Sequence, residues 1–120
     1  MTAKRILIIE DDLDLAENMS DALTLEGFYV ECSNDAPLGE KLIRSGNFDI
    51  ILLDHKMPVL TGTEILKQLK ADHIKKRIFI ISGRPSIEQI LKEENVFDMV
   101  SGIIDKPINF EALLEKINQL

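Results

Sequence analysis

The spacing of apolar residues switches repeatedly along this chain, and no other feature restricts the possible fold as strongly. Short, nearly continuous apolar runs occupy residues 5–9, 48–53, 77–82 and 102–105, whereas residues 28–33 alternate between apolar and polar. Continuous runs are typical of strands that are covered on both faces, and alternation is typical of an edge strand. Between these runs, apolar residues recur every three or four positions, as on one face of a helix. The pattern predicts five strands that alternate with five helices.

Local signals agree with this alternation. Gly27 supplies a helix stop, Pro37 lies in the first turn of a short helix, and Asn109 is a candidate N-cap. The predicted helices span residues 13–26, 37–46, 63–70, a segment around 87–91, and the segment that follows Asn109. Strands that alternate with helices form a parallel sheet. Each right-handed helical crossover brings the chain back to the end where the previous strand began, so the next strand runs in the same direction. The sequence therefore predicts an α/β fold, a doubly wound five-stranded parallel sheet with helices on both faces.

Ligands of such sheets bind beyond the carboxyl ends of the strands. The polar residues predicted at that edge are Glu10, Asp11 and Asp12 after the first strand, Asp54 after the third, Ser82 and Gly83 at the fourth, and Asp105 and Lys106 at the fifth. Acids that converge on one edge repel each other unless a cation lies among them. Mg²⁺ suits such a site because it accepts one or two carboxylates and leaves room for phosphate oxygens.

A lysine and a hydroxyl beside these acids favour a site for a phosphoryl group. Asp54 is the best candidate nucleophile, because it follows a central strand and lies between the acids and the hydroxyl. Taken alone, each residue has a simpler interpretation. Asp11 or Asp12 is an N-cap, Asp54 is a solvated loop acid, and Ser82 is a turn residue.

Composition excludes several classes of function. The chain has 14 basic and 21 acidic residues, a net charge of −7, which argues against nucleic acid as a direct partner. No apolar run approaches the roughly 18 residues needed to span a bilayer, and the N-terminus does not resemble a signal peptide. We therefore expect a cytoplasmic protein without membrane insertion, in which residues 1–120 form one domain. The single cysteine, Cys32, excludes an internal disulfide and is predicted to pack in the core.

The segments "ILIIEDD", "LLDHKMPVLTG", "IISG" and "DKP", in this order, resemble the receiver domain of bacterial two-component response regulators, in its single-domain, CheY-like form. The resemblance covers the whole chain and implies the flavodoxin-like strand order 2-1-3-4-5. It also implies that Asp54 accepts a phosphoryl group from the phosphohistidine of a sensor histidine kinase, or exchanges it with a histidine phosphotransfer protein. Partner binding would change as a result.

The resemblance assigns a role to each site residue. Mg²⁺ would be bound by Asp12 directly, by Asp11 through water, by Asp54 and by the backbone carbonyl of Lys56. Lys106 would pair with the phosphoryl oxygens, and the peptide bond between Lys106 and Pro107 would be cis. Further bonds to the phosphoryl group are expected from the Ser82 hydroxyl and from the backbone N–H groups of Lys56 and Gly83.

Two features of the sequence stand out beside the receiver-domain pattern: one residue departs from it, and two cations lie close to the expected site. Ile103 occupies the position where most receivers have an aromatic residue, so we expect the output face to change less on phosphorylation. Lys56 and Arg84 stand where the family lines the path of attacking water, and we expect them to lengthen the lifetime of the phosphoryl group. The alternative is two solvated cations. His55 and His73 are interpreted as surface residues.

Other functions fit less well. A magnesium-dependent phosphatase of the haloacid dehalogenase type would need an acid two residues after the nucleophile, where this chain has Lys56. A flavin-binding protein would need a phosphate loop in place of the acidic segment. A static interaction module, or a receiver fragment of a larger regulator, remains open. We expect the chain to catalyse only its own phosphorylation and dephosphorylation, and to contact its kinase around Asp14, Glu17 and Asn18.

Overall fold

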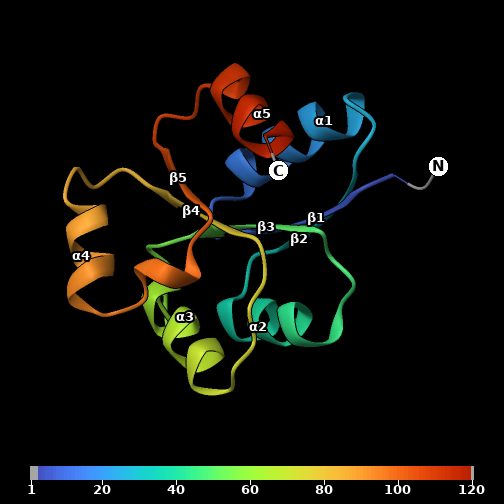
Figure 1. Cartoon of the computed structure of the whole chain (residues 1–120). Helices are drawn as coiled ribbons and strands as arrows, with labels where there is room; N and C mark the ends of the chain where they lie inside the picture. Colours follow the sequence, from blue (N-terminus) through green and yellow to red (C-terminus); the bar gives the residue numbers. More distant parts are fainter. Residues whose placement is uncertain (1–2, 120) are drawn as a thin grey trace.

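In the computed structural model, which describes residues 3–119, a single parallel sheet is covered by helices on both faces (Figure 1). The strand order is β2-β1-β3-β4-β5, as the resemblance implies. The strands are β1 (Arg5–Ile9), β2 (Tyr29–Ser33), β3 (Ile50–Asp54), β4 (Ile78–Ser82) and β5 (Gly102–Asp105). The helices are α1 (Leu13–Leu25), α2 (Ala36–Ser45), α3 (Gly62–Ala71), α4 (Ile87–Glu93) and α5 (Phe110–Asn118), with a short 3₁₀ helix, η1 (Phe97–Met99), before β5.

Side chains that accept hydrogen bonds from backbone N–H groups fix where several helices begin. The side chains of Asp12, Asp35 and Asn109 each accept a hydrogen bond from a backbone N–H in the first turn of the helix that follows. Thr61 and Glu64 form a reciprocal capping box at α3. The chain leaves α1 at Gly27, whose φ of 95° is a left-handed conformation that glycine adopts without strain. The predicted N-cap at Asn109 and the predicted helix stop at Gly27 are confirmed.

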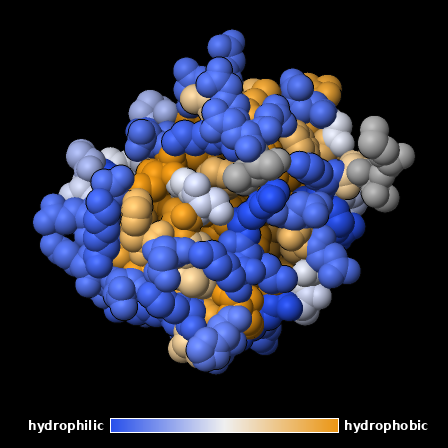
Figure 2. All heavy atoms as spheres, viewed as in Figure 1, coloured by the Kyte–Doolittle hydropathy of each residue, from blue (hydrophilic) through white to orange (hydrophobic). Residues whose placement is uncertain are grey.

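Two apolar layers enclose the sheet. On one face, Leu7, Ile9, Ile51, Leu53, Ile78 and Ile80 pack against α2, α3 and α4. On the other face, Ile6, Ile8, Ile50, Leu52, Phe79 and Ile81 pack against α1 and α5. Both faces of the central strands are therefore buried, which explains their continuous apolar sequences. Hydrophilic side chains cover most of the face in Figure 2, with hydrophobic residues visible between them.

Some boundaries and one core assignment differ from the prediction. β3 begins at Ile50 rather than Phe48 and includes Asp54. Cys32 is exposed, so its predicted place in the core is wrong. The reason is that β2 is an edge strand, paired only with β1 and partly open to solvent. In residues 3–119, no helix has the length and apolarity that a membrane span requires.

Candidate functional site

The site is built where β1 and β3 end side by side. Ile9 pairs with Leu53 in the register of these strands, so the next residues, Glu10 and Asp54, lie next to each other. Glu10 is 0% exposed and Asp54 is 2% exposed. Two adjacent buried carboxylates carry a large desolvation cost unless they share a proton or meet a cation.

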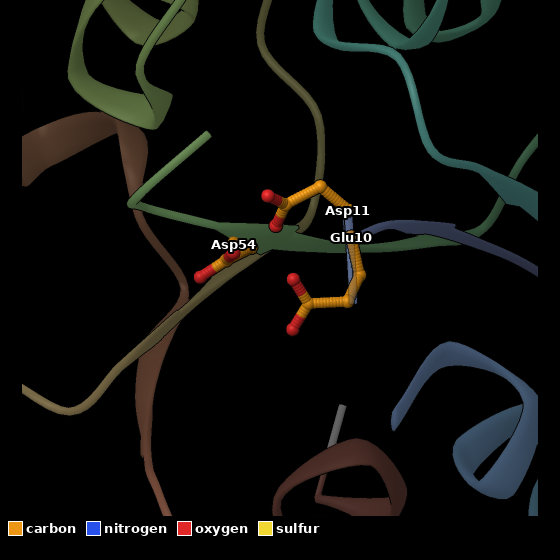
Figure 3. Close-up of side chains that lie close together, drawn as sticks. All are labelled: Glu10, Asp11 and Asp54. Carbon is orange, nitrogen blue, oxygen red and sulfur yellow. The ribbon is translucent and has the colours of Figure 1, made fainter. Parts of the chain in front are cut away.

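A third carboxylate joins them. Oxygens of Glu10, Asp11 and Asp54 all lie within 4.8 Å of one another, and Figure 3 shows the three side chains turned toward a common space. Asp11 is exposed, whereas the other two acids are buried. The group therefore opens to solvent on one side, where a hard cation with its own waters fits.

Lys106 neutralises part of this charge. Its Nζ lies 3.0 Å from Oε1 of Glu10 and 3.2 Å from Oδ1 of Asp54. Lys106 follows β5 directly, and its backbone N–H donates to the carbonyl of Ser82 at 2.9 Å. The bond between Lys106 and Pro107 is cis, which confirms the prediction.

This arrangement shifts two pKa values. The pKa of Glu10 is raised to about 8, mainly by burial and then by the neighbouring Asp54, while Lys106 lowers it in part. Burial lowers the pKa of Lys106, but its contacts with Glu10 and Asp54 outweigh that effect and leave the pKa raised. The acidic group therefore holds a proton readily, and a metal ion would compete with that proton.

Asp12 lines the same cleft but does not belong to the group of three carboxylates. Its side chain accepts a hydrogen bond from the N–H of Leu15 at 3.1 Å, as the N-cap of α1. Of the predicted metal ligands, the structure groups Asp11 and Asp54 together with Glu10, and the direct role of Asp12 stays a prediction. Glu10, which was in the inventory of acids but not among the predicted ligands, takes the place beside Asp54. The strand register identifies Glu10: Ile9 pairs with Leu53, so the residue after Ile9 lies beside the residue after Leu53, which is Asp54.

The remaining predicted residues surround Asp54. Ser82 is buried at the end of β4, and its Oγ accepts a hydrogen bond from the N–H of Arg84 at 3.0 Å. The N–H of Lys56 points to Oδ1 of Asp54 at 3.4 Å, a long contact. A Cβ on Gly83 would lie 3.6 Å from Cβ of Lys106, so this glycine lies close to the lysine. One common cleft is lined by Glu10, Asp11, Asp12, Asp54, Lys56, Met57, Pro58 and Lys106.

His55 is not a surface residue. It is 7% exposed, and its Nε2 lies 2.8 Å from Oγ1 of Thr63. Burial lowers the pKa of His55, and the positive charge of Arg84 lowers it further. The two cations predicted to tune the phosphoryl lifetime, Lys56 and Arg84, are exposed and line a pocket together with His55 and Thr61. His73 is exposed, as predicted.

Ile103 lies on β5 and is only partly buried. Its side chain packs against the apolar layer under α2, α3 and α4. Its carbonyl accepts a hydrogen bond from Nζ of Lys116 on α5. The backbone at this position is thus tied to α5, while the side chain belongs to the opposite face of the sheet.

Comparison with known proteins shows the family to which the chain belongs. Residues 6–118 match the model of the response regulator receiver domain. The chain is 31% identical over 116 residues to the cell cycle response regulator CtrA of Brucella ovis, covering 97% of this chain and 49% of that protein. The chain thus spans about half the length of the curated relatives it matches.

Solved structures show the same architecture. A CheY-like receiver domain protein from Methanospirillum hungatei matches with a TM-score of 0.85 and 32% identity, over 98% of this chain and 92% of that one. The chemotaxis response regulator CheY4 of Vibrio cholerae matches with a TM-score of 0.84 and 27% identity, over 98% of both chains. The chain belongs to the receiver domain family of response regulators.

Proposed function

We propose that this receiver domain, formed by residues 1–120, is a phosphorylation-dependent switch whose acceptor is Asp54. One observation carries the proposal: a nearly fully buried aspartate at the end of a central strand has a lysine ammonium 3.2 Å away and two further carboxylates within 4.8 Å. Burial of so many charges is costly for stability alone, whereas each has a use in phosphoryl transfer.

The proposed reaction is a displacement at phosphorus. An Oδ of Asp54 attacks the phosphorus of a phosphohistidine, an O–P bond forms and the N–P bond breaks. The electron pair of that bond stays on the imidazole nitrogen, which takes up a proton from solvent. The ammonium of Lys106, which already lies beside Asp54, stabilises the negative charge that develops on the phosphoryl oxygens. The Ser82 hydroxyl and the N–H groups of Lys56 and Gly83 hold the product. Water later hydrolyses the acyl phosphate and resets the switch.

The residues present fit Mg²⁺. Oε1 of Glu10 is buried and, within residues 3–119, has no hydrogen bond of good geometry although the Lys106 ammonium is near. We propose that Glu10, Asp11, Asp54 and the Lys56 carbonyl hold the ion, with Asp12 left to cap α1. When bound, Mg²⁺ supplies positive charge that offsets the carboxylates and the phosphoryl oxygens.

The partner is proposed to be a sensor histidine kinase or a histidine phosphotransfer protein. Asp14, Glu17 and Asn18 are exposed on α1, which begins just after the acidic residues of the site. A docking protein could therefore contact α1 and still reach Asp54. Lys56 and Arg84, exposed beside the site, are proposed to lengthen the phosphoryl lifetime by shielding it from water.

Phosphorylation by acetyl phosphate, read by intact mass, tests the proposal. Wild type should gain one phosphoryl group in the presence of Mg²⁺, and neither wild type without Mg²⁺ nor Asp54→Asn should do so. A folded wild-type protein that gains nothing would instead support a static interaction module.

A further inference from the structure

The residue that follows the proposed acceptor is part of a buried polar pair. Side chains of His55 and Thr63 are each 7% exposed, and Nε2 of His55 lies 2.8 Å from Oγ1 of Thr63. Two apolar side chains could fill the same space without any need for partners. A buried polar pair of this kind holds its groups in one geometry, because separating them leaves both unsatisfied.

The pair joins the two ends of one loop. His55 is the first residue after β3, and Thr63 lies in the first turn of α3. At the same place the N–H of Gly62 donates to the His55 carbonyl at 3.0 Å. A Cβ on Gly62 would lie 3.0 Å from Cα of His55 and 3.2 Å from the Asp54 carbonyl, so the two ends are in close contact.

The tip of this loop is strained and exposed. Val59 has a φ of 72° and is 89% exposed. A left-handed conformation is unfavourable for a β-branched residue and persists only when the surrounding chain enforces it. The N–H of Leu60 donates to the Pro58 carbonyl at 2.8 Å across Val59, and the contacts at the loop's base hold the two ends of the loop together.

The same base carries the backbone groups that the site needs. Lys56 follows His55, and its N–H points to Oδ1 of Asp54 at 3.4 Å. We propose that the hydrogen bond between His55 and Thr63 is a latch that sets the position of the Lys56 backbone relative to Asp54. His55 and Thr63 are then positioning residues for metal binding and phosphorylation, although neither touches a reacting atom. This inference rests on the proposed function.

Matched substitutions at Thr63 test the latch. Thr63→Val keeps the shape and removes the hydroxyl, whereas Thr63→Ser keeps the hydroxyl and removes a methyl group. The measurement is the Mg²⁺ dissociation constant, from an amide-shift titration with MgCl₂ in the absence of any phosphodonor. We expect Thr63→Val to weaken Mg²⁺ binding by about fivefold, the equivalent of one lost hydrogen bond, and Thr63→Ser to bind like wild type.

A second pair of variants approaches from the other side. His55→Leu removes the bond, and His55→Gln places an amide nitrogen at about the same reach as Nε2. His55→Gln should recover the Mg²⁺ affinity that His55→Leu loses. Hydrogen exchange at the Gly62 amide, measured without metal, should be faster in Thr63→Val and His55→Leu than in the matched partners.

The outcomes separate two failures. If Thr63→Val lowers the melting temperature but binds Mg²⁺ and exchanges the Gly62 amide as Thr63→Ser does, the bond only stabilises the fold and the latch is wrong. If wild type itself binds no Mg²⁺ and accepts no phosphoryl group, the proposed function fails. The hydrogen-exchange comparison would still show whether the loop is latched.

Discussion

The two sides of Asp54 are held by different forces. On the side of β1 and β5, the groups are ionisable: Glu10 lies beside both Asp11 and Lys106. On the side of α3, the contact is between two neutral side chains, His55 and Thr63. Charged contacts change with protonation and with a bound cation, whereas a buried neutral bond does not. The comparison indicates that one side responds to the incoming groups and the other keeps the acceptor in place.

Removing the lysine should have the largest effect. Lys106→Met keeps much of the side-chain volume and removes the only cation that the structure shows, within residues 3–119, in ion-pair contact with Asp54 and Glu10. We expect the phosphorylation rate with acetyl phosphate to fall by about 100-fold or more, because the developing charge loses a preorganised partner. Lys92→Met, which removes an exposed pair with Glu88 and a cation–π contact with Phe97, both away from Asp54, is the matched control and should react like wild type. A loss no larger than the fivefold expected from the latch would remove the distinction between the two sides.

Protonation of Glu10 should change stability through the charged side. The pKa of Glu10 is raised from 4.5 to about 8, so between these values the folded protein holds a proton that the unfolded chain has lost. Without metal, the free energy of unfolding should therefore fall as pH rises from about 7 to 8, by at most about 1.4 kcal/mol per pH unit; below about pH 6.5 the lowered pKa of His55 acts in the opposite direction. Urea unfolding across this range measures the slope, which Glu10→Gln should reduce. Saturating Mg²⁺ should also reduce it, because the ion takes the place of the proton. If the free energy of unfolding of Glu10→Gln fell with pH as steeply as that of wild type, the group with the raised pKa would not be Glu10.

Much of this site could be predicted from the sequence because it lies at strand ends. Continuous apolar runs located the central strands, and the residues after them include Asp54 and Lys106, which the structure brings together. The sequence could not separate the roles of the adjacent acids, because Asp12 also caps α1 while Glu10 and Asp11 are the two that lie beside Asp54. His55 was misplaced because its partner, Thr63, is contacted only after the loop closes. Pairwise burial of this kind has no local signal in the chain.

Removing the exposed cations near His55 and Thr63 should have a smaller effect, on the lifetime of the phosphoryl group. Lys56 and Arg84 line the pocket that also contains His55 and Thr61. We expect the Lys56→Ala, Arg84→Ala double variant to lose its phosphoryl group about three to five times faster, because solvated charges contribute about 1 kcal/mol or less. Decay of the phosphorylated protein after removal of acetyl phosphate gives the rate. Lys41→Ala, Arg77→Ala is the control, since both residues are exposed and lie outside this pocket. Equal lifetimes would leave Lys56 and Arg84 as solvated cations.

The smallest effect is expected at Ile103 on β5, the position at which the resemblance to receiver domains leads us to expect an aromatic residue. Its side chain packs into the layer under α4, and its carbonyl is held by Lys116, so neither part is free to swing as a ring would. Adding beryllofluoride and Mg²⁺ should therefore shift the amides near Asp54 strongly and those of α4, β5 and α5 only weakly. Ile103→Tyr is the informative variant, because an aromatic ring there should enlarge the shifts in α4 and β5 while leaving those near Asp54 as in wild type. Large shifts across α4, β5 and α5 in the wild-type protein would mean that the signal crosses the sheet without a ring, with the backbone link from Lys106 through Ile103 to Lys116 as the first place to look.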